Sequence, residues 1–452
     1  MSQLQPTPNT PKFDPSASHQ QRPKVRALRG FPVEAQNQQG QKMQMLGLAD
    51  ARQISDKMIV TSPAAQHVIP LLDGTRDLDQ IVAQVGRGLT LEILQQLVAQ
   101  LDDAGLLEGP VFQAILTKSR AEFDASDTLP PASTAAFADM LVMQAVGKDA
   151  TDEQKAAEGP KKMKDLFDQW MSQALQNVQK PSFDELPKAI VAPHLDYGRG
   201  WLNYANIYGR LRVCDRPDRV IILGTNHFGL GTGVVGCNKG YETPLGTSPV
   251  DEGVLSGLRS RIGEKLFNNR FDHEREHSIE LHIPWIQHIF GRNDRGEFIP
   301  VFGALVHDPS ATSGESYDGQ GVALQTFVTA LKETVAGLPG RTLIISSADL
   351  SHVGPAFGDQ KPMVGESKEI EENRNKVVQH DLQMLDMVIK NKPSELMASM
   401  AWQQNPTRWC SVGNLVATLM TVEPKEVEML NYAAAVDQQG MTMVSSAAMA
   451  MR

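Results

Sequence analysis

Cysteine is scarce in this chain of 452 residues, which has only Cys214, Cys237 and Cys410. An odd number of cysteines, with no pair at Cys-x-x-Cys spacing, argues against a disulfide-stabilised secreted protein. The first 26 residues also contain no apolar core of the kind that a signal peptide needs. We therefore expect a reduced, cytoplasmic protein.

Long apolar runs and clusters of basic residues are also missing. No stretch reaches 18 consecutive apolar residues, so the sequence predicts no membrane span. Lys and Arg total 43 against 53 Asp and Glu, which gives a net charge of −10. Without a basic patch, binding to DNA or RNA is not expected.

The length and the 41% hydrophobic content predict two globular domains joined by a linker. Residues 1–26 are rich in Pro, Gln, Ser and Asn and are predicted to be disordered. A small domain is expected at 27–115, a linker with a helical lead-in at 116–185, and a large α/β domain at 186–452.

The small domain begins with two short strands around a polar turn, within 27–48. Apolar residues then recur at helical spacing in three segments, 62–74, 75–86 and 89–107. Three short helices in a row are typical of a winged-helix core, so we expect a small α+β winged-helix domain.

The phrase "LLDGTRDLDQIV…LVAQLDDAGLLEGP" resembles the PqqD-like peptide-chaperone family of pyrroloquinoline-quinone biosynthesis. This resemblance covers most of 40–110 and implies binding of a peptide or partner at a strand edge. A winged helix kept for docking or dimerisation is the alternative interpretation.

The linker contains two different patterns. Residues 121–137 are rich in Pro, Ala, Ser and Thr and are predicted to form a loop. Residues 161–178 carry apolar side chains at helical spacing and are predicted to form an amphipathic helix.

From residue 186 onwards, apolar strands alternate with helical segments. The predicted strands are 188–193, 219–225, 298–305 and 341–349. This alternation predicts a mostly parallel sheet with helices on both faces.

Three of the predicted strands are each followed within three residues by a histidine. His194, His227 and His352 stand in these positions, and Asp349 closes the last strand. Ligands of open α/β sheets bind at the carboxyl ends of strands, so we expect these side chains to meet. Imidazoles with one anionic ligand suit Fe(II), Cu, Zn or Mn, and Asp349, Glu280 and Cys410 are the anionic candidates.

The segment DHEREHSIELHIP, residues 272–284, holds a second group of His and Glu residues. His277 and Glu280 are predicted to form a polar wall of the pocket. For His273, Glu274 and Glu276, a solvated, charged start of a helix is the favoured interpretation.

Cys410 precedes a predicted buried helix at 414–420. A thiolate at the N-terminus of a helix has a lowered pKa and serves as a metal ligand or a nucleophile. Inert packing is an equally good interpretation from the residues alone. Cys214 and Cys237 have no such context and are predicted to be structural.

Nine phrases, spread over about 190–435, together resemble the Memo family, called AmmeMemoRadiSam system protein B in bacteria. They are "APHLDYGRG", "IILGTNHFG", "YETPLGTSPVD", "EHSIELHIPWIQ", "IPVFGALV", "ISSADLSHVG", "DLQMLDMVI", "WCSVGN" and "MLNYAAA". The resemblance implies a fold similar to class III extradiol dioxygenases, which hold non-haem iron on two histidines and a carboxylate.

By the same resemblance, His194, His227 and Cys410 would line the metal site. Asp349 and His352 would lie beside it, and His277 would face the cleft. The sequence departs from the family at Asp196 and Ser411, where relatives often have glycine. The family's N-terminal Tyr-Pro phrase is also not evident at 131–140.

Two hypotheses follow. One is a metal-dependent redox enzyme with Fe(II) or Cu, in which His352, oriented by Asp349, acts as general acid or base. The other is a non-catalytic adaptor that binds a peptide or partner. The resemblance implies a radical-SAM protein as a possible partner. The sequence leaves the substrate and the oligomeric state open.

Overall fold

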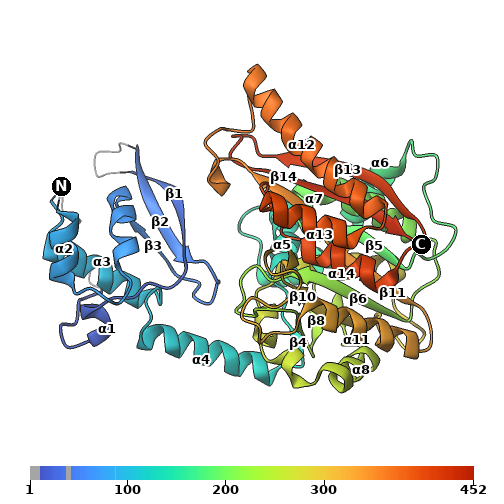
Figure 1. The fold of residues 1–452 in the computed structure, drawn as a ribbon, viewed down its shortest axis with the longest axis horizontal. Helices are drawn as coiled ribbons and strands as arrows, with labels where there is room; N and C mark the ends of the chain where they lie inside the picture. Colours follow the sequence, from blue (N-terminus) through green and yellow to red (C-terminus); the bar gives the residue numbers. More distant parts are fainter. Residues whose placement is uncertain (1–10, 37–41, 87) are drawn as a thin grey trace. The chain divides into compact units, whose positions relative to one another are not determined.

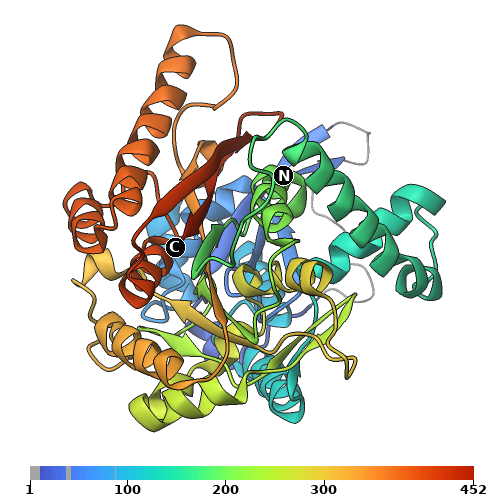
Figure 2. The same cartoon turned by 90° about the vertical axis from the view of Figure 1, so that its right-hand side faces the viewer.

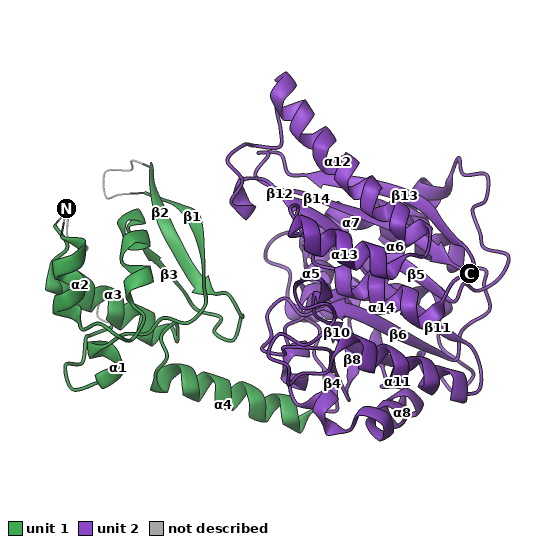
Figure 3. Cartoon of the chain, viewed as in Figure 1, with its two compact units in different colours: residues 1–126 green, residues 127–452 purple. Residues whose placement is uncertain are grey.

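The protein is described by a computed structural model that places residues 11–36, 42–86 and 88–452. The chain forms two compact units, Met1–Ser126 and Asp127–Arg452 (Figure 3). Among the placed residues, no helix has the length and apolarity needed to cross a membrane.

The first unit contains a three-stranded antiparallel sheet followed by helices. Its strands are β1 (Leu28–Gln36), β2 (Lys42–Asp50) and β3 (Met58–Thr61). The two predicted strands are confirmed, and the four-residue β3 was not predicted. Helices α2 (Leu78–Val85), α3 (Leu91–Asp103) and α4 (Pro110–Ala125) follow the sheet.

The predicted helix at 62–74 is wrong in type. Two 3-10 turns, η1 (Pro63–His67) and η2 (Ile69–Leu71), replace it. Pro70 lacks an amide hydrogen and its ring crowds the preceding turn, which disfavours a continuous α-helix through this point.

Disorder is predicted for residues 1–26, and the structure describes only residues 11–26 of this segment. Residues 1–10 lie outside the described residues. Residues 11–26 contain the short helix α1 (Ser18–Gln21). There, His19 Nε2 lies 2.8 Å from Asp102 Oδ2, and Gln20 donates to the same oxygen.

The predicted loop at 121–137 is also corrected. It contains the end of α4, the short strand β4 (Thr128–Leu129) and the start of α5 (Ser133–Val146). The local sequence of α5 offers no capping side chain, and Glu280 supplies the cap from a distance. The predicted amphipathic helix at 161–178 is confirmed over 161–175, which lies within the longer α6 (Asp152–Leu175).

The second unit is built on an eight-stranded sheet (Figures 1 and 2). Its order is β12-β14-β5-β11-β6-β10-β7, and β13 pairs with β14. The bounds are β5 Ala189–Ala192, β6 Arg219–Thr225, β7 Val235–Gly236, β10 Val301–Val306, β11 Thr342–Ser347, β12 Asp349–Val353, β13 Val427–Val436 and β14 Met443–Met451.

The sheet is mixed, not mostly parallel. Strands β5, β11, β6 and β10 are parallel, as the alternation of strands and helices predicts. The strands β7, β12, β13 and β14 pair antiparallel around this centre. A separate small sheet combines β4, β8 (Gly240–Thr243) and β9 (Gly246–Ser248).

Helices cover both faces of the sheet, as predicted. Successive residues of a strand point to opposite faces. Ser446 of β14 bonds to Asn203 of α7 (Tyr197–Leu211), whereas Ser445 bonds to Asp381 of α12 (Lys368–Ile389). These two helices therefore lie on opposite sides of β14. The remaining helices of this unit are α8 (Glu252–Ile262), α9 (His277–Glu280), α10 (Ile283–Phe290), α11 (Leu324–Gly337), α13 (Pro393–Gln403) and α14 (Val412–Val422).

Candidate metal centre

The predicted side chains meet at the carboxyl ends of three neighbouring strands. His194 follows β5, His227 follows β6, and Asp349 follows β11, which lies between them in the sheet. Because the three strands are parallel, their carboxyl ends reach the same edge. Strand ends in a buried sheet hold such side chains rigidly.

His194 is buried and its ring is held by a defined hydrogen bond. Its Nδ1 lies 2.9 Å from Oγ of Ser347, and that hydroxyl donates to the Ser278 carbonyl at 2.6 Å. Because the hydroxyl has only one hydrogen, it must accept from Nδ1 of His194. The lone pair of the neutral ring is therefore on Nε2. Burial holds the pKa of His194 well below its usual value, so the ring stays neutral.

His227 is held by the buried carboxylate of Glu276. Nδ1 of His227 lies 3.0 Å from Oε1, and its backbone N–H donates to Oε2 at 2.9 Å. Burial lowers the pKa of His227, but the Glu276 carboxylate and the Cys410 thiol outweigh it, so this pKa is raised well above its usual value. The same contacts keep the pKa of Glu276 low, despite its burial.

Cys410 lies at the entry to α14 and is tied to the strand ends. Its carbonyl accepts from Oγ1 of Thr225 at 3.1 Å, and Asn414 donates to the same Thr225 hydroxyl at 2.9 Å. The neighbouring Ser411 hydroxyl donates to the Asp349 carbonyl. Burial raises the pKa of the Cys410 thiol, and His227 acts in the opposite direction.

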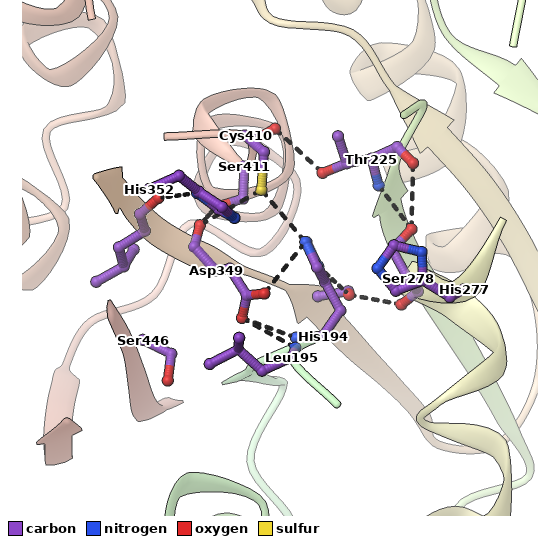
Figure 4. Close-up of polar contacts among 12 residues, drawn as sticks. His194, Leu195, Thr225, His277, Ser278, Asp349, His352, Cys410, Ser411 and Ser446 are labelled. Atoms are coloured by element: carbon purple, nitrogen blue, oxygen red, sulfur yellow. Dashed lines mark hydrogen bonds and ion pairs between the residues drawn. The ribbon is translucent and has the colours of Figure 1, made fainter. Parts of the chain in front are cut away.

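These three side chains converge on one point. Nε2 of His194 lies 3.2 Å from Sγ of Cys410 (Figure 4), and the rings of His194 and His227 are 5.1 Å apart. One ligand atom each from His194, His227 and Cys410 lies within 4.8 Å of the others. Two imidazoles and a thiol suit a borderline or soft transition metal, so the donor set fits Fe(II), Cu or Zn.

Asp349 contacts His194 and not His352. Its Oδ1 accepts the backbone N–H groups of His194 and Leu195 at 3.0 and 3.2 Å. Its Oδ2 lies 3.6 Å from Nε2 of His194. Burial raises the pKa of Asp349 to about 7, although both backbone bonds work in the opposite direction.

The predicted orientation of His352 by Asp349 is therefore wrong. Nδ1 of His352 lies 2.9 Å from the Leu350 carbonyl, which can only accept, so Nδ1 carries the hydrogen and Nε2 the lone pair. Burial lowers the pKa of His352 to about 4. In Figure 4, this ring lies on the opposite side of His194 from His277.

His277 lies beside the metal-ligand candidates, as expected. Its ring stacks against that of His227, with centroids 5.0 Å apart and 25° between the planes. Its Nδ1 is 3.3 Å from Oε1 of Glu276, and burial lowers its pKa. His227, Glu276 and His277 form a second group with metal-ligating atoms close together, and this group shares His227 with the first.

Glu280 and Asp196 hold helix ends instead of lining the centre. Oε1 of Glu280 accepts the backbone N–H groups of Ala132 and Thr134 at 2.9 and 2.8 Å, at the start of α5. Asp196 accepts the backbone N–H of Arg199 at 3.1 Å and caps α7. Glu280 is therefore not available as the anionic ligand.

The sequence interpretation missed Glu276 and Ser347. The sequence favours a solvated helix start for Glu276, whereas its side chain is buried against His227. The sequence signal that points to Glu276 is its place directly before His277, which is predicted to line the pocket. His273, from the same segment, is also buried, and its Nε2 lies 3.1 Å from the Val235 carbonyl.

The geometry defines an α/β protein with a candidate transition-metal centre at the carboxyl edge of its sheet. The family model "Memo-like protein" matches residues 157–451, and the chain belongs to the Memo family. This match lies inside the second unit.

Several relatives share this region, and each is described as a MEMO1 family protein. One from Methanopyrus kandleri is 29% identical over 258 residues, which cover 56% of this chain and 77% of the relative. One from Thermotoga maritima is 29% identical over 262 residues, covering 57% and 79%. One from Pyrobaculum arsenaticum is 32% identical over 180 residues, covering 39% and 58%.

Proposed function

We propose that this Memo protein binds a transition metal, Fe(II) or Cu, through His194, His227 and Cys410. The observation that carries the proposal is the 3.2 Å approach of Nε2 of His194 to Sγ of Cys410, with His227 within the same small volume. The Nδ1 atoms of His194 and His227 donate to Ser347 Oγ and to the Glu276 carboxylate, so Nε2 is the nitrogen of each ring that remains to ligate a metal, which is typical of metal-bound histidine.

We further propose a redox site related to that of class III extradiol dioxygenases. A bound Fe(II) or Cu ion supplies redox and Lewis-acid chemistry. Near it, the free Nε2 of His352 can accept a proton. Asp349, whose buried Oδ2 lies 3.6 Å from Nε2 of His194, is the second group there that can hold or release a proton. In this proposal Cys410 stands in place of the carboxylate that the resemblance to the dioxygenases implies, and a thiolate favours softer ions.

Anaerobic purification followed by metal analysis tests the proposal. We expect about one transition-metal ion per chain in the wild type. His194→Ala and Cys410→Ser should lose most of it. His288→Ala and Cys214→Ser are matched controls outside the centre, and both should keep it. A wild-type protein without stoichiometric metal would contradict the proposal, as would full metal content in His194→Ala and Cys410→Ser.

The second candidate function is a partner-binding adaptor. It is supported by β3, an edge strand of the first unit, where Met58 is 58% and Val60 41% exposed. A PqqD-like winged helix would use such an edge to bind a peptide or a radical-SAM protein. The double variant Met58→Lys/Val60→Lys should abolish capture of the peptide or the radical-SAM protein. Met43→Lys on β2 should leave this capture unchanged. Unchanged capture in the double variant would exclude this edge.

A further inference from the structure

A buried carboxylate on α12 contacts the segments that carry the candidate centre. Asp381 is fully buried and accepts four side-chain hydrogen bonds. The donors are Ser351 Oγ at 2.5 Å, Trp409 Nε1 at 2.7 Å, Tyr432 OH at 2.7 Å and Ser445 Oγ at 2.5 Å. All four donors are neutral. A carboxylate is buried at a high desolvation cost, which bonds from several donors offset.

Two of these donors are the immediate sequence neighbours of residues at the centre, Cys410 and His352. Trp409 directly precedes Cys410, and its indole lies 1% exposed with its N–H aimed at Asp381. Ser351 stands between Asp349 and His352. The Asp381 carboxylate therefore connects the segment that carries Cys410 to the segment that carries Asp349 and His352.

The hydrogen bond from Ser351 to Asp381 lies at an irregularity in the pairing of β12. The pairing of β12 with β14 shifts register between Asp349 and His352. A bulge of this kind redirects the side chains that follow it. The Ser351 backbone N–H donates to Oγ of Ser445 at 3.0 Å, and both serine hydroxyls donate to Asp381. Asp381 thus fixes the bulge from which His352 projects.

We propose that Asp381 is a positioning residue of the metal centre, which sets the places of Cys410 and His352 through Trp409 and Ser351. The part that concerns metal affinity rests on the proposed function. The part that concerns the placement of the Cys410 thiol stands without a metal.

The variant Asp381→Asn tests the proposal, because an amide cannot accept all four bonds and brings donors of its own. Tyr432→Phe is the matched control, since it removes one bond to the same carboxylate but from β13. All variants are made in a protein that also carries Cys214→Ser. Because Cys237 is fully buried, Cys410 is then the thiol that a reagent modifies. Far-UV circular dichroism and gel filtration check that each variant is folded.

The first measurement uses metal-free protein and the rate at which an aromatic disulfide reagent modifies Cys410. We expect this rate to change at least about threefold in Asp381→Asn and to stay within about 1.5-fold in Tyr432→Phe. Trp409→Phe keeps the carboxylate and aromatic bulk but loses the N–H, and it should shift the rate in the same direction. An unchanged rate in both Asp381→Asn and Trp409→Phe would overturn the proposal.

The second measurement is titration with Co(II), whose thiolate charge-transfer band reports ligation by cysteine. Asp381→Asn should raise the dissociation constant about tenfold and shift this band, while Tyr432→Phe should match the wild type. Wild-type affinity and band in Asp381→Asn would also overturn the positioning role. A wild type that binds no Co(II) would instead contradict the proposed function, and the thiol rates would still decide the role of Asp381.

Discussion

Glu276 holds His227 at two points: its Oε2 accepts the His227 backbone N–H at 2.9 Å, while its Oε1 lies 3.0 Å from Nδ1 of the ring. Oε1 also accepts the backbone N–H of Ser278 at 2.9 Å. One carboxylate therefore fixes the position, ring orientation and tautomer of a candidate metal ligand, as carboxylate–histidine–metal arrangements do.

Glu276→Gln should weaken metal binding without removing a ligand. The amide cannot serve both His227 donors and Ser278 as an anion does, so the ring loses orientation and basicity. We expect the dissociation constant for the metal to rise about 10- to 100-fold. Competition with a chromophoric chelator measures this, and an affinity within twofold of the wild type would contradict the role of Glu276.

Glu280→Gln is the matched control in the same segment. It should lower the stability of the fold and leave metal binding unchanged. Its carboxylate accepts the N–H groups of Ala132, Ser133 and Thr134 at the start of α5. An amide places a donor against one of them, which should lower the free energy of unfolding by about 2 kcal/mol. Urea denaturation measures the loss. Metal affinity should remain that of the wild type, and a weakened affinity would show that Glu280 serves the centre after all.

The buried His282 should make the protein less stable in acid. Burial lowers its pKa to about 3, from an ordinary value of 6.5. Its Nδ1 lies 2.8 Å from the Tyr208 hydroxyl, and its Nε2 has no hydrogen-bond partner among the described residues. Above pH 6.5 the ring is neutral in both states, and its stabilising contribution is complete. As the pH falls below 6.5, the unfolded state binds the proton first, so stability decreases down to about pH 3.

The double variant Tyr208→Phe/His282→Phe removes this titration together with the hydroxyl that faces it. Between pH 6 and 4, the slope of unfolding free energy against pH should decrease by about 1.4 kcal/mol per pH unit. Urea denaturation across this range measures both slopes. Equal slopes in the variant and the wild type would mean that His282 is not held neutral in the fold.

Cys410→Asp should change which metal the centre prefers. A carboxylate restores the two-histidine, one-carboxylate donor set of non-haem iron sites, whereas the thiol favours softer ions. We expect the affinity for Cu(I) relative to Fe(II) to fall by at least about tenfold. Competition between the two ions under anaerobic conditions measures the ratio, and Cys214→Asp is the control. An unchanged ratio would mean that Cys410 is not a ligand.

The convergence of His194, His227 and Asp349 could be predicted because it depends on local features. Buried apolar strands are visible in the sequence, and parallel strands bring their carboxyl ends to one edge. The helices on both faces follow from the same alternation. The antiparallel pairing of β7, β12, β13 and β14 could not be predicted in the same way. The local sequence of a strand does not determine whether it pairs parallel or antiparallel.

The supporting contacts depend on segments that meet only in the folded chain. Glu276 reaches His227 across 49 positions, and Asp381 reaches Trp409 across 28. The sequence around Glu276 is consistent with a solvated helix start, and only tertiary packing buries it. His352 is a similar case, because its ring bonds to the Leu350 carbonyl two residues away and not to the nearby Asp349.

X-ray absorption at the metal edge tests the central claim most directly. For metal-loaded wild type, we predict one sulfur scatterer at about 2.3 Å and two imidazole nitrogens at about 2.0–2.1 Å. Cys410→Ser should lose the sulfur shell, and Cys214→Ser should keep it. A wild-type spectrum without sulfur, or one whose sulfur shell survives in Cys410→Ser, would contradict a centre built on His194, His227 and Cys410.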